Sequence, residues 1–200
     1  MIEKGSFVCV FCASQVSGNK IYAAAAEELG TKLALNGYNL VYGGGGRGLM
    51  GIVSKGAHTA GAKVLGIIPN ALIQREGNDT EVETIVVNDM HTRKRMMNEK
   101  CSAFITLPGG FGTFEELLEM TTWSLLSIHS KPIIVLNINN FYEPLMKQFD
   151  NAIEAEFIKQ ENKDIVIFCS TVDEAIEKLS TYQVPGSRFE LDWTIKDSFV

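Results

Sequence analysis

Short apolar runs alternate with longer stretches of helical periodicity along most of the chain. Most of these runs are rich in Val, Ile and Phe without polar alternation, which is typical of strands buried on both faces of a parallel sheet. The pattern predicts seven strands, at residues 7–12, 39–42, 63–68, 85–87, 103–107, 132–136 and 164–168.

Helical patterns fill the intervals between these strands. The first of them places Ala23, Ala26, Leu29 and Leu33 on one side and stops at Gly37, a suitable C-terminal cap. The predicted helices are residues 19–36, 49–59, 90–101, 113–127, 142–158 and 172–179.

The alternation of strands and helices predicts the overall architecture. It indicates right-handed crossovers and a doubly wound, mainly parallel α/β sheet of the Rossmann-like class, with helices on both faces. We expect a single domain over residues 1–180, with a polar connection at residues 70–83, and a C-terminal tail at residues 181–200. Ligands bind beyond the carboxyl ends of the strands in such sheets, and both glycine clusters of this chain fall at such ends.

The first glycine cluster, residues 43–51, follows the second predicted strand. Gly43, Gly45 and Gly48 satisfy the G-x-G-x-x-G spacing of dinucleotide-binding turns. The next strand weakens that interpretation, because it ends without an acidic residue for a ribose diol. A P-loop is excluded because no Lys-Ser or Lys-Thr pair follows the glycines. Two interpretations stay open: a turn required for packing, and a backbone that approaches a ligand closely.

The second glycine cluster, residues 108–113, joins the strand at 103–107 to the helix at 113–127. Successive glycines let backbone N–H groups face an anion, and the helix N-terminus adds the positive end of its dipole. Thr113 can cap the helix or donate a hydrogen bond to a phosphate oxygen. We therefore interpret Gly109, Gly110, Gly112 and Thr113 as a phosphate-binding loop.

Two carboxylates follow this loop in the first turn of the helix. Complementing the helix dipole suffices to explain Glu115, which lies about 200° around the helix from Thr113. Glu116 is three residues from Thr113 and shares its face. Because a carboxylate would repel a bound phosphate, we interpret Glu116 as a group that acts on the attached sugar rather than one that binds.

Arg93 and Lys94 lie in the first turn of the helix at 90–101, beyond another strand end. Basic residues there oppose the helix dipole at a cost of roughly a few tenths of a kcal/mol. An anionic partner explains them better than helix stability does. Ion pairs with carboxylates of the chain itself are the alternative interpretation.

Composition narrows the function classes further. The chain has 200 residues and a net charge of −6, so it lacks the basic character of a nucleic-acid-binding protein. The apolar run at residues 7–12 is too short for a signal peptide or a membrane span, and we expect a cytoplasmic protein that does not associate with membranes. Cys9 and Cys12 form a C-x-x-C within a predicted strand, where an offset of three places them on opposite faces. We expect buried structural cysteines and no metal site, because the three His also lack metal-ligand spacing.

The motifs together resemble a known family. Met90-His91-x-Arg93-Lys94, followed by Pro-Gly-Gly-x-Gly-Thr-x-x-Glu at residues 108–116, resembles the signature of the LONELY GUY family. These proteins are cytokinin riboside 5′-monophosphate phosphoribohydrolases, often labelled lysine decarboxylases. The likeness extends to residues 10–14, 40–51, 131–132 and 141–142. It implies a Rossmann-like homodimer that needs no cofactor and hydrolyses the N-glycosidic bond of an N6-substituted AMP to free base and ribose 5-phosphate.

The resemblance also implies roles for individual residues. Arg93 and Glu116 fall on the catalytic positions, and the phosphate-binding loop falls on Gly109, Gly110, Gly112 and Thr113. Further positions that match nucleotide-contacting sites of the family are Ser14, Gly44, Gly45, Met90 and Lys94.

Alternative functions share parts of this pattern. One is a broader purine or pyrimidine nucleoside 5′-monophosphate nucleosidase with the same reacting residues and another base pocket. Another is a non-enzymatic carrier of a nucleotide or of molybdenum cofactor that uses the Pro-Gly-Gly loop only to bind. The joint presence of Arg93 and Glu116 favours an enzyme. A pyridoxal-phosphate decarboxylase is disfavoured, because nothing in the sequence places a Lys as its Schiff base.

Overall fold

Seven parallel strands form one sheet in the computed structural model, which describes residues 2–77 and 79–193. Their spatial order is β4-β3-β2-β1-β5-β6-β7, and every neighbouring pair is parallel. The strands are β1 (Phe7–Phe11), β2 (Asn39–Tyr42), β3 (Val64–Pro69), β4 (Glu83–Val87), β5 (Ala103–Thr106), β6 (Ile133–Leu136) and β7 (Val166–Cys169).

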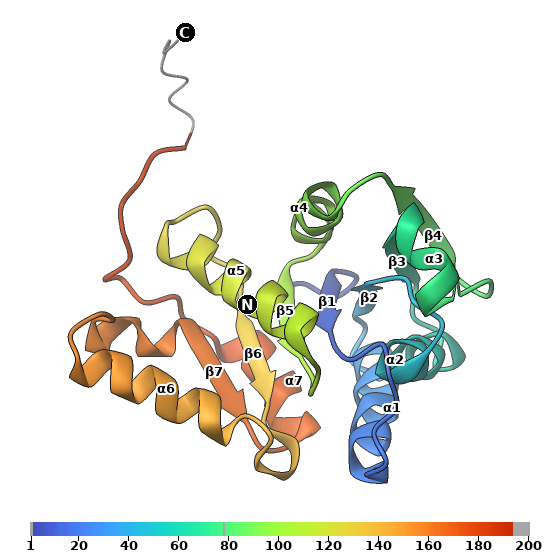
Figure 1. Ribbon diagram of the computed structural model, residues 1–200, viewed down its shortest axis with the longest axis horizontal. Helices are drawn as coiled ribbons and strands as arrows, with labels where there is room; N and C mark the ends of the chain where they lie inside the picture. Colours follow the sequence, from blue (N-terminus) through green and yellow to red (C-terminus); the bar gives the residue numbers. More distant parts are fainter. Residues whose placement is uncertain (1, 78, 194–200) are drawn as a thin grey trace, which may run out of the picture.

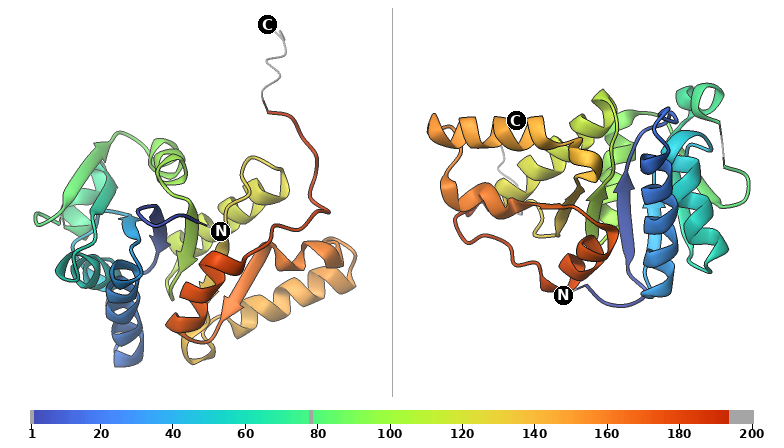
Figure 2. Two further views of the ribbon diagram at one scale, coloured as in Figure 1. Left: turned by 180° about the vertical axis from the view of Figure 1, so that it is seen from behind. Right: turned by 90° about the horizontal axis from the view of Figure 1, so that it is seen from below.

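Helices cover both faces of this sheet (Figures 1 and 2). The α-helices are α1 (Lys20–Leu35), α2 (Gly48–Thr59), α3 (Asn70–Glu76), α4 (Met90–Lys100), α5 (Phe111–Leu125), α6 (Glu143–Glu154) and α7 (Val172–Thr181). Two 3-10 helices, η1 (Ile138–Asn140) and η2 (Gln160–Ile165), precede α6 and β7.

Alternate residues of the central strand belong to different cores. Val8 of β1 packs in the core that contains the inward side chains of α1, α2 and α7, such as Leu29. Cys9 belongs to the opposite core, which holds Met97 of α4 and Leu117 of α5 together with inward side chains of α6. The predicted doubly wound α/β sheet is therefore confirmed.

The strand order reverses at β1, and this reversal creates a crevice. The chain moves outward from β1 through β2, β3 and β4, and then returns to place β5 on the other side of β1. Val10 of β1 is in register with Tyr42 of β2 and with Ile105 of β5. Loops from the two halves of the sheet thus diverge beyond the carboxyl ends of β1 and β5, which is where open α/β sheets bind ligands.

Two local predictions were wrong. Residues 70–83 contain a helix, α3, in place of a polar connection throughout. Its seven residues are too few for a periodic pattern, and none of them is buried. The second is the start of α5, which begins at Phe111 with Gly110 as its N-cap. Thr113 is therefore the third helical residue and does not cap the helix.

The cysteines lie as the pattern predicts. Cys9 and Cys12 belong to the two opposite cores, and Cys9, Cys12, Cys101 and Cys169 are all buried and free. The described helices include none that is long and apolar enough to cross a membrane. Within residues 2–77 and 79–193, no group of His, Cys, Asp and Glu side chains could hold a metal ion.

The described part of the predicted tail packs at the C-terminal end of α5. Arg188 Nη1 donates hydrogen bonds to the carbonyl oxygens of Ser124, at 2.9 Å, and His129, at 2.8 Å. Trp193 Nε1 donates to the carbonyl oxygen of Leu126 at 2.7 Å. These bonds satisfy carbonyl groups near the end of the helix, and Figure 1 shows the segment rising beside α5. Residues 194–200 of the tail lie outside the described residues.

Candidate active site

A cavity of about 460 Å³ lies beyond the carboxyl ends of β1, β2 and β5. Its size is ordinary for a small-molecule site, and it coincides with the crevice where the strand order reverses. The wall residues all fall between Val10 and Glu116 in the sequence. They come from the end of β1 and the turn after it, the turn after β2, helices α2, α3 and α4, and the N-terminal part of α5.

Arg93 of α4 is held in the cavity wall by backbone carbonyl groups. Its side chain is only 6% exposed. Nε donates to the carbonyl oxygen of Ile67 in β3 at 3.2 Å, and Nη2 donates to the carbonyl oxygen of Gly43 after β2 at 3.1 Å. Strand β3 and the turn after β2 therefore fix the guanidinium group in the cavity wall.

Gly43 makes room for this guanidinium group. A Cβ atom at Gly43 would lie 2.0 Å from Arg93 Nη2, so any side chain there would displace Arg93. Gly44 and Gly45 are absent from the cavity wall. Gly44 adopts φ of +77° and packs against Ile67 and Ile68, while Gly45 packs against Met50 and Glu76. The packing interpretation of the first glycine cluster therefore explains both residues, and the expected nucleotide contact has no support in their placement.

Glu116 of α5 faces Arg93 across the cavity wall. Arg93 Nη1 lies 3.8 Å from Glu116 Oε1, an ion pair that is too long for a hydrogen bond. Burial raises the pKa of Glu116 to about 7, against the opposing effect of the positive charge of Arg93. The carboxylates of Glu115 and Glu76 raise this pKa further. The result is a carboxyl group that titrates near neutrality, as expected of a general acid or base.

The N-terminus of α5 faces the same cavity. Gly110, Gly112 and Thr113 contribute to the wall, and a Cβ atom added at Gly110 or Gly112 would meet nothing within 4 Å. The first N–H groups of an α-helix have no partner within it, so they are available to an anion. Gly109 has another role, because its missing Cβ leaves space for the side chain of Thr113. The segment therefore combines an open backbone with a buried hydroxyl group.

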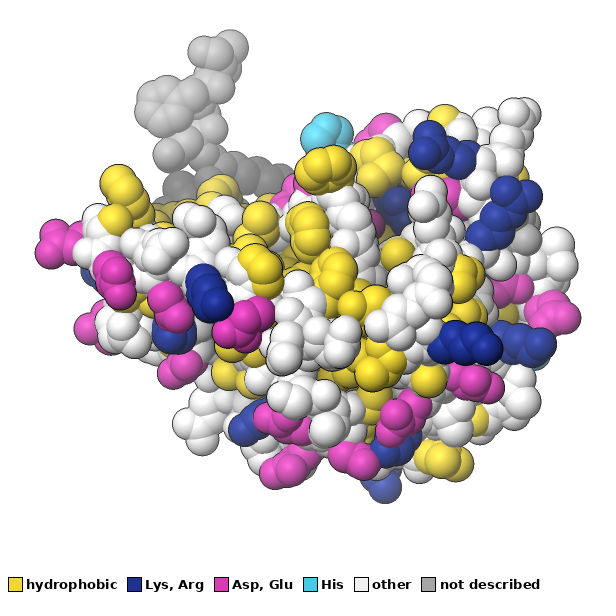
Figure 3. Space-filling view, turned by 60° about the horizontal axis from the view of Figure 1, so that its bottom comes forward, with side chains coloured by type: hydrophobic (Ala, Val, Ile, Leu, Met, Phe, Trp, Pro, Cys, Tyr) yellow, Lys and Arg dark blue, Asp and Glu magenta, His cyan; other side chains and the backbone are white. Residues whose placement is uncertain are grey.

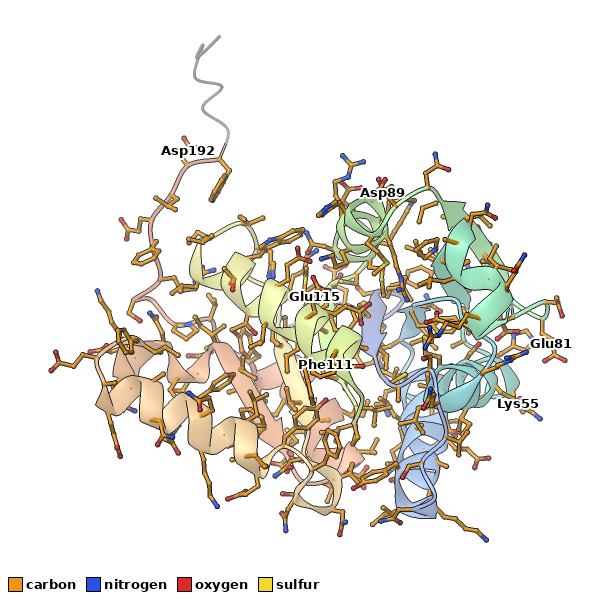
Figure 4. The ribbon with its side chains drawn as sticks, viewed as in Figure 1. Lys55, Glu81, Asp89, Phe111, Glu115 and Asp192 are labelled. Atoms are coloured by element: carbon orange, nitrogen blue, oxygen red, sulfur yellow. The ribbon has the colours of Figure 1, made fainter. Side chains whose placement is uncertain are left out.

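Lys94 is absent from the wall of this cavity. It forms ion pairs with Glu115 and, at 2.9 Å, with Glu119, and its side chain is only 7% exposed. The alternative interpretation from the sequence, an ion pair within the chain, therefore holds for Lys94. Its pairs tie α4 to α5, the two helices that carry Arg93 and Glu116. The expectation that Glu115 serves the helix dipole was wrong, because α5 begins at Phe111 and Glu115, which Figure 4 marks on it, lies beyond the first turn. Its ion pair with Lys94 explains it instead.

The remaining predicted positions and some unpredicted ones complete the wall. Ser14 and Met90 line the cavity, as does Phe111, which is 93% exposed at the start of α5 (Figure 4). Arg75 and Glu76 of α3, which no sequence motif predicted, also line it. The only signal for them was a charged pair at the end of a segment without periodicity.

Charge on the surface is mixed. Figure 3 shows acidic and basic side chains interspersed around hydrophobic ones on one face of the molecule, with no continuous basic stripe across it. That distribution agrees with the negative net charge of the chain.

The chain is similar to a described protein family and to named members of that family. A family model described as "Possible lysine decarboxylase" matches residues 50–179. The chain is 47% identical over 176 residues to probable cytokinin riboside 5′-monophosphate phosphoribohydrolase LOGL2 of Oryza sativa subsp. japonica, covering 88% of this chain and 72% of that protein. It is 44% identical over 184 residues to cytokinin riboside 5′-monophosphate phosphoribohydrolase LOG4 of Arabidopsis thaliana, covering 90% and 86%.

Solved structures share the fold at lower identity. The molybdenum cofactor carrier protein of Chlamydomonas reinhardtii superposes with a TM-score of 0.67 at 21% identity, covering 88% of this chain and 96% of that one. The molybdenum cofactor binding protein of Rippkaea orientalis gives a TM-score of 0.66 at 22% identity, covering 90% and 98%. These likenesses concern the fold alone.

Proposed function

The chain belongs to the LONELY GUY family of cytokinin riboside 5′-monophosphate phosphoribohydrolases, and on this premise we propose that it hydrolyses the N-glycosidic bond of an N6-modified AMP. The products are the free base and ribose 5-phosphate. The observation that carries the proposal is the buried pair of Arg93 and Glu116 in a cavity that the open N-terminus of α5 also lines.

The N-terminus of α5 is the proposed site of the 5′-phosphate. Its free N–H groups, the positive end of the helix dipole and the Thr113 hydroxyl all favour an anion there. Fixing the phosphate also fixes the ribose, so that C1′ is held near Glu116 rather than diffusing within the cavity.

Glu116 is the proposed reacting carboxylate. As the bond from C1′ to the base breaks, the sugar acquires positive charge, which an ionised Glu116 stabilises. The same carboxylate orients the attacking water and accepts its proton. The base leaves with the electron pair of the broken bond and takes up a proton from solvent, so one water molecule is consumed for each bond cleaved. Because Arg93 donates its hydrogen bonds to Ile67 and Gly43, it leaves the oxygens of Glu116 free for this water. The charge of Arg93 meanwhile favours the ionised form of Glu116.

A direct assay tests the proposal against its alternatives. The purified protein is incubated separately with AMP, N6-isopentenyl-AMP, IMP and CMP, and free base is quantified by chromatography. We expect base release from N6-isopentenyl-AMP, with ribose 5-phosphate as the other product. Comparable release from all four nucleotides would instead indicate a broad nucleosidase. Release from none of them would contradict enzymatic hydrolysis and favour a carrier.

The proposed role of Glu116 predicts a pH dependence. Glu116 must be ionised to act, and its pKa lies at about 7. We therefore expect kcat/KM to fall about tenfold per pH unit below pH 7 and to level off above it. The measurement is kcat/KM between pH 5 and pH 9. The substrate phosphate, whose second pKa is about 6, could also lower the rate on the acid side of the profile. The variant Glu116→Gln separates the two causes. A fall in rate that is due to the phosphate would persist in its residual activity, whereas a fall that is due to Glu116 would disappear. A flat wild-type profile from pH 5 to pH 8 would contradict the assignment.

We also propose that the protein acts as a cytoplasmic homodimer. Apolar side chains of Met90, Phe111 and Leu118 are exposed on α4 and α5, which supports association through this side of the molecule. The four buried free thiols are typical of a reducing compartment.

A further inference from the structure

Glu76 is a carboxylate without a hydrogen-bond partner in the cavity wall. It is the last residue of α3 and lines the cavity beside Leu72 and Arg75. Its Oε2 atom is buried, and no described residue donates a hydrogen bond to it. A Cβ atom at Gly45 would lie 3.5 Å from this oxygen, so the carboxylate is packed against the glycine turn. A buried acceptor of this kind is expected to have a donor, and the described chain supplies none.

The fold, and not its own polar contacts, holds Glu76 in place. Arg47 Nη1 donates to the carbonyl oxygen of Arg75 at 3.3 Å, and the backbone N–H of Gly46 donates to the carbonyl oxygen of Gly77 at 3.3 Å. A little further along, Asp79 accepts hydrogen bonds from Tyr42, at 3.1 Å, and from Ser54, at 2.7 Å. These bonds attach the end of α3 and the following turn to the glycine cluster, β2 and α2.

The strand order places Glu76 at the opposite end of the cavity from the proposed phosphate site. Helix α5 follows β5, whereas Glu76 at the end of α3 packs against Gly45 in the turn after β2, and β1 lies between β2 and β5. Two strand spacings separate the two ends, about 10 Å in total. The Arg93–Glu116 pair lies between, since Arg93 is bonded to Gly43 and Ile67 while Glu116 extends from α5. A nucleotide with its phosphate at α5 and C1′ at Glu116 therefore extends its base toward α3.

We propose that Glu76 accepts a hydrogen bond from the exocyclic N6–H group of the base and so determines base specificity; this inference rests on the proposed function. A carboxylate accepts hydrogen bonds and does not donate them, so it selects a base with an N–H donor at this position. Leu72, Met50 and Met90, which line the same cavity, supply apolar surface for the rest of the base and its substituent. A base with one N6 substituent keeps a donor, whereas a base with two substituents has none.

A pair of substrates that differ only in this donor tests the inference. We expect wild-type kcat/KM for N6-methyl-AMP to exceed that for N6,N6-dimethyl-AMP by about 10–100-fold, because a site built to receive a hydrogen bond rejects an analogue that lacks the donor. In Glu76→Ala we expect this ratio to fall by about 10-fold or more, since only the bulk of the second methyl group then distinguishes the two substrates. The ratio of the two kcat/KM values does not depend on how much of the variant folds, because both values are measured on the same preparation and scale with the same fraction of active protein.

Glu83→Ala is the matched control. Glu83 is an exposed carboxylate of the neighbouring strand β4, and its removal is expected to leave the wild-type ratio unchanged. Equal wild-type values for the two substrates would overturn the inference, and so would a wild-type ratio that persists in Glu76→Ala. Both results leave hydrolysis itself intact, whereas failure of the wild-type protein to release base from any nucleotide would overturn the proposed function as well.

Discussion

Glu116→Gln is expected to lower kcat by about 10²–10⁴-fold while the protein remains folded. The amide has nearly the shape of the carboxylate, but it neither stabilises positive charge at C1′ nor accepts a proton from water. We expect this variant to be as stable as the wild type, because the pKa of Glu116 shows that its ionisation does not stabilise the fold. Burial raises the pKa of Glu116 in the folded chain to about 7, so the unfolded chain binds fewer protons below that pH. Ionisation of Glu116 therefore lowers stability as pH rises toward 7, and the amide removes this effect.

The measurements are steady-state base release and thermal unfolding at pH 8. Glu115→Gln is the matched control, because Glu115 is the preceding residue of α5 and its side chain is 50% exposed. Its removal leaves Lys94 paired with Glu119, and we expect activity within a few-fold of wild type. Near-normal turnover by Glu116→Gln would remove this residue from the proposed mechanism.

Arg93→Ala is expected to reduce kcat/KM by about 10²–10³-fold and, unlike Glu116→Gln, to destabilise the fold. Loss of the guanidinium group removes a fixed positive charge beside Glu116, which raises the pKa of that carboxyl group further and depletes its active form. The carbonyl groups of Ile67 and Gly43 also lose their buried donor. Breaking a buried ion pair and its hydrogen bonds costs about 3–5 kcal/mol.

Urea unfolding and the pH profile of kcat/KM measure these two consequences separately. The control is Arg95→Ala, on the same helix, where an exposed side chain forms an ion pair with Glu99 at 3.9 Å. Surface pairs of this type contribute about 0–1 kcal/mol, so Arg95→Ala should behave like wild type. If Arg93→Ala keeps both the wild-type rate and the wild-type pH limb, Arg93 does not act on Glu116.

Much of the fold was predictable because parallel strands buried on both faces leave uninterrupted apolar runs. The runs at β2, β5 and β6 appear in the sequence within a residue or so of their observed bounds. Helix α3 could not be found in this way. Leu72 and Ile73 are only half-buried, and seven residues complete too few turns to show a period.

The candidate site could be predicted from charged residues that occur where the local structure does not favour their charge. Arg93 opposes the dipole of its helix, and Glu116 follows a loop suited to anions. Adjacent residues of a helix point about 100° apart, and the sequence does not show which of Arg93 and Lys94 faces the cavity. Only the packing of α4 against α5 shows that Lys94 binds carboxylates of the chain. The place of Glu76 in the site could not be predicted from the sequence for a related reason. Its position depends on how α3 packs against the glycine turn.

The confinement of the cavity wall to residues 10–116 has a consequence for folding during synthesis. Every wall residue has been translated before β6 exists. Yet Leu117 and Met120, which fix the orientation of α5, pack in the same core as Ile133 and Tyr142. We therefore expect the nascent chain to acquire Arg93 in place before Glu116, and to become competent for hydrolysis only after the C-terminal half has emerged and docked.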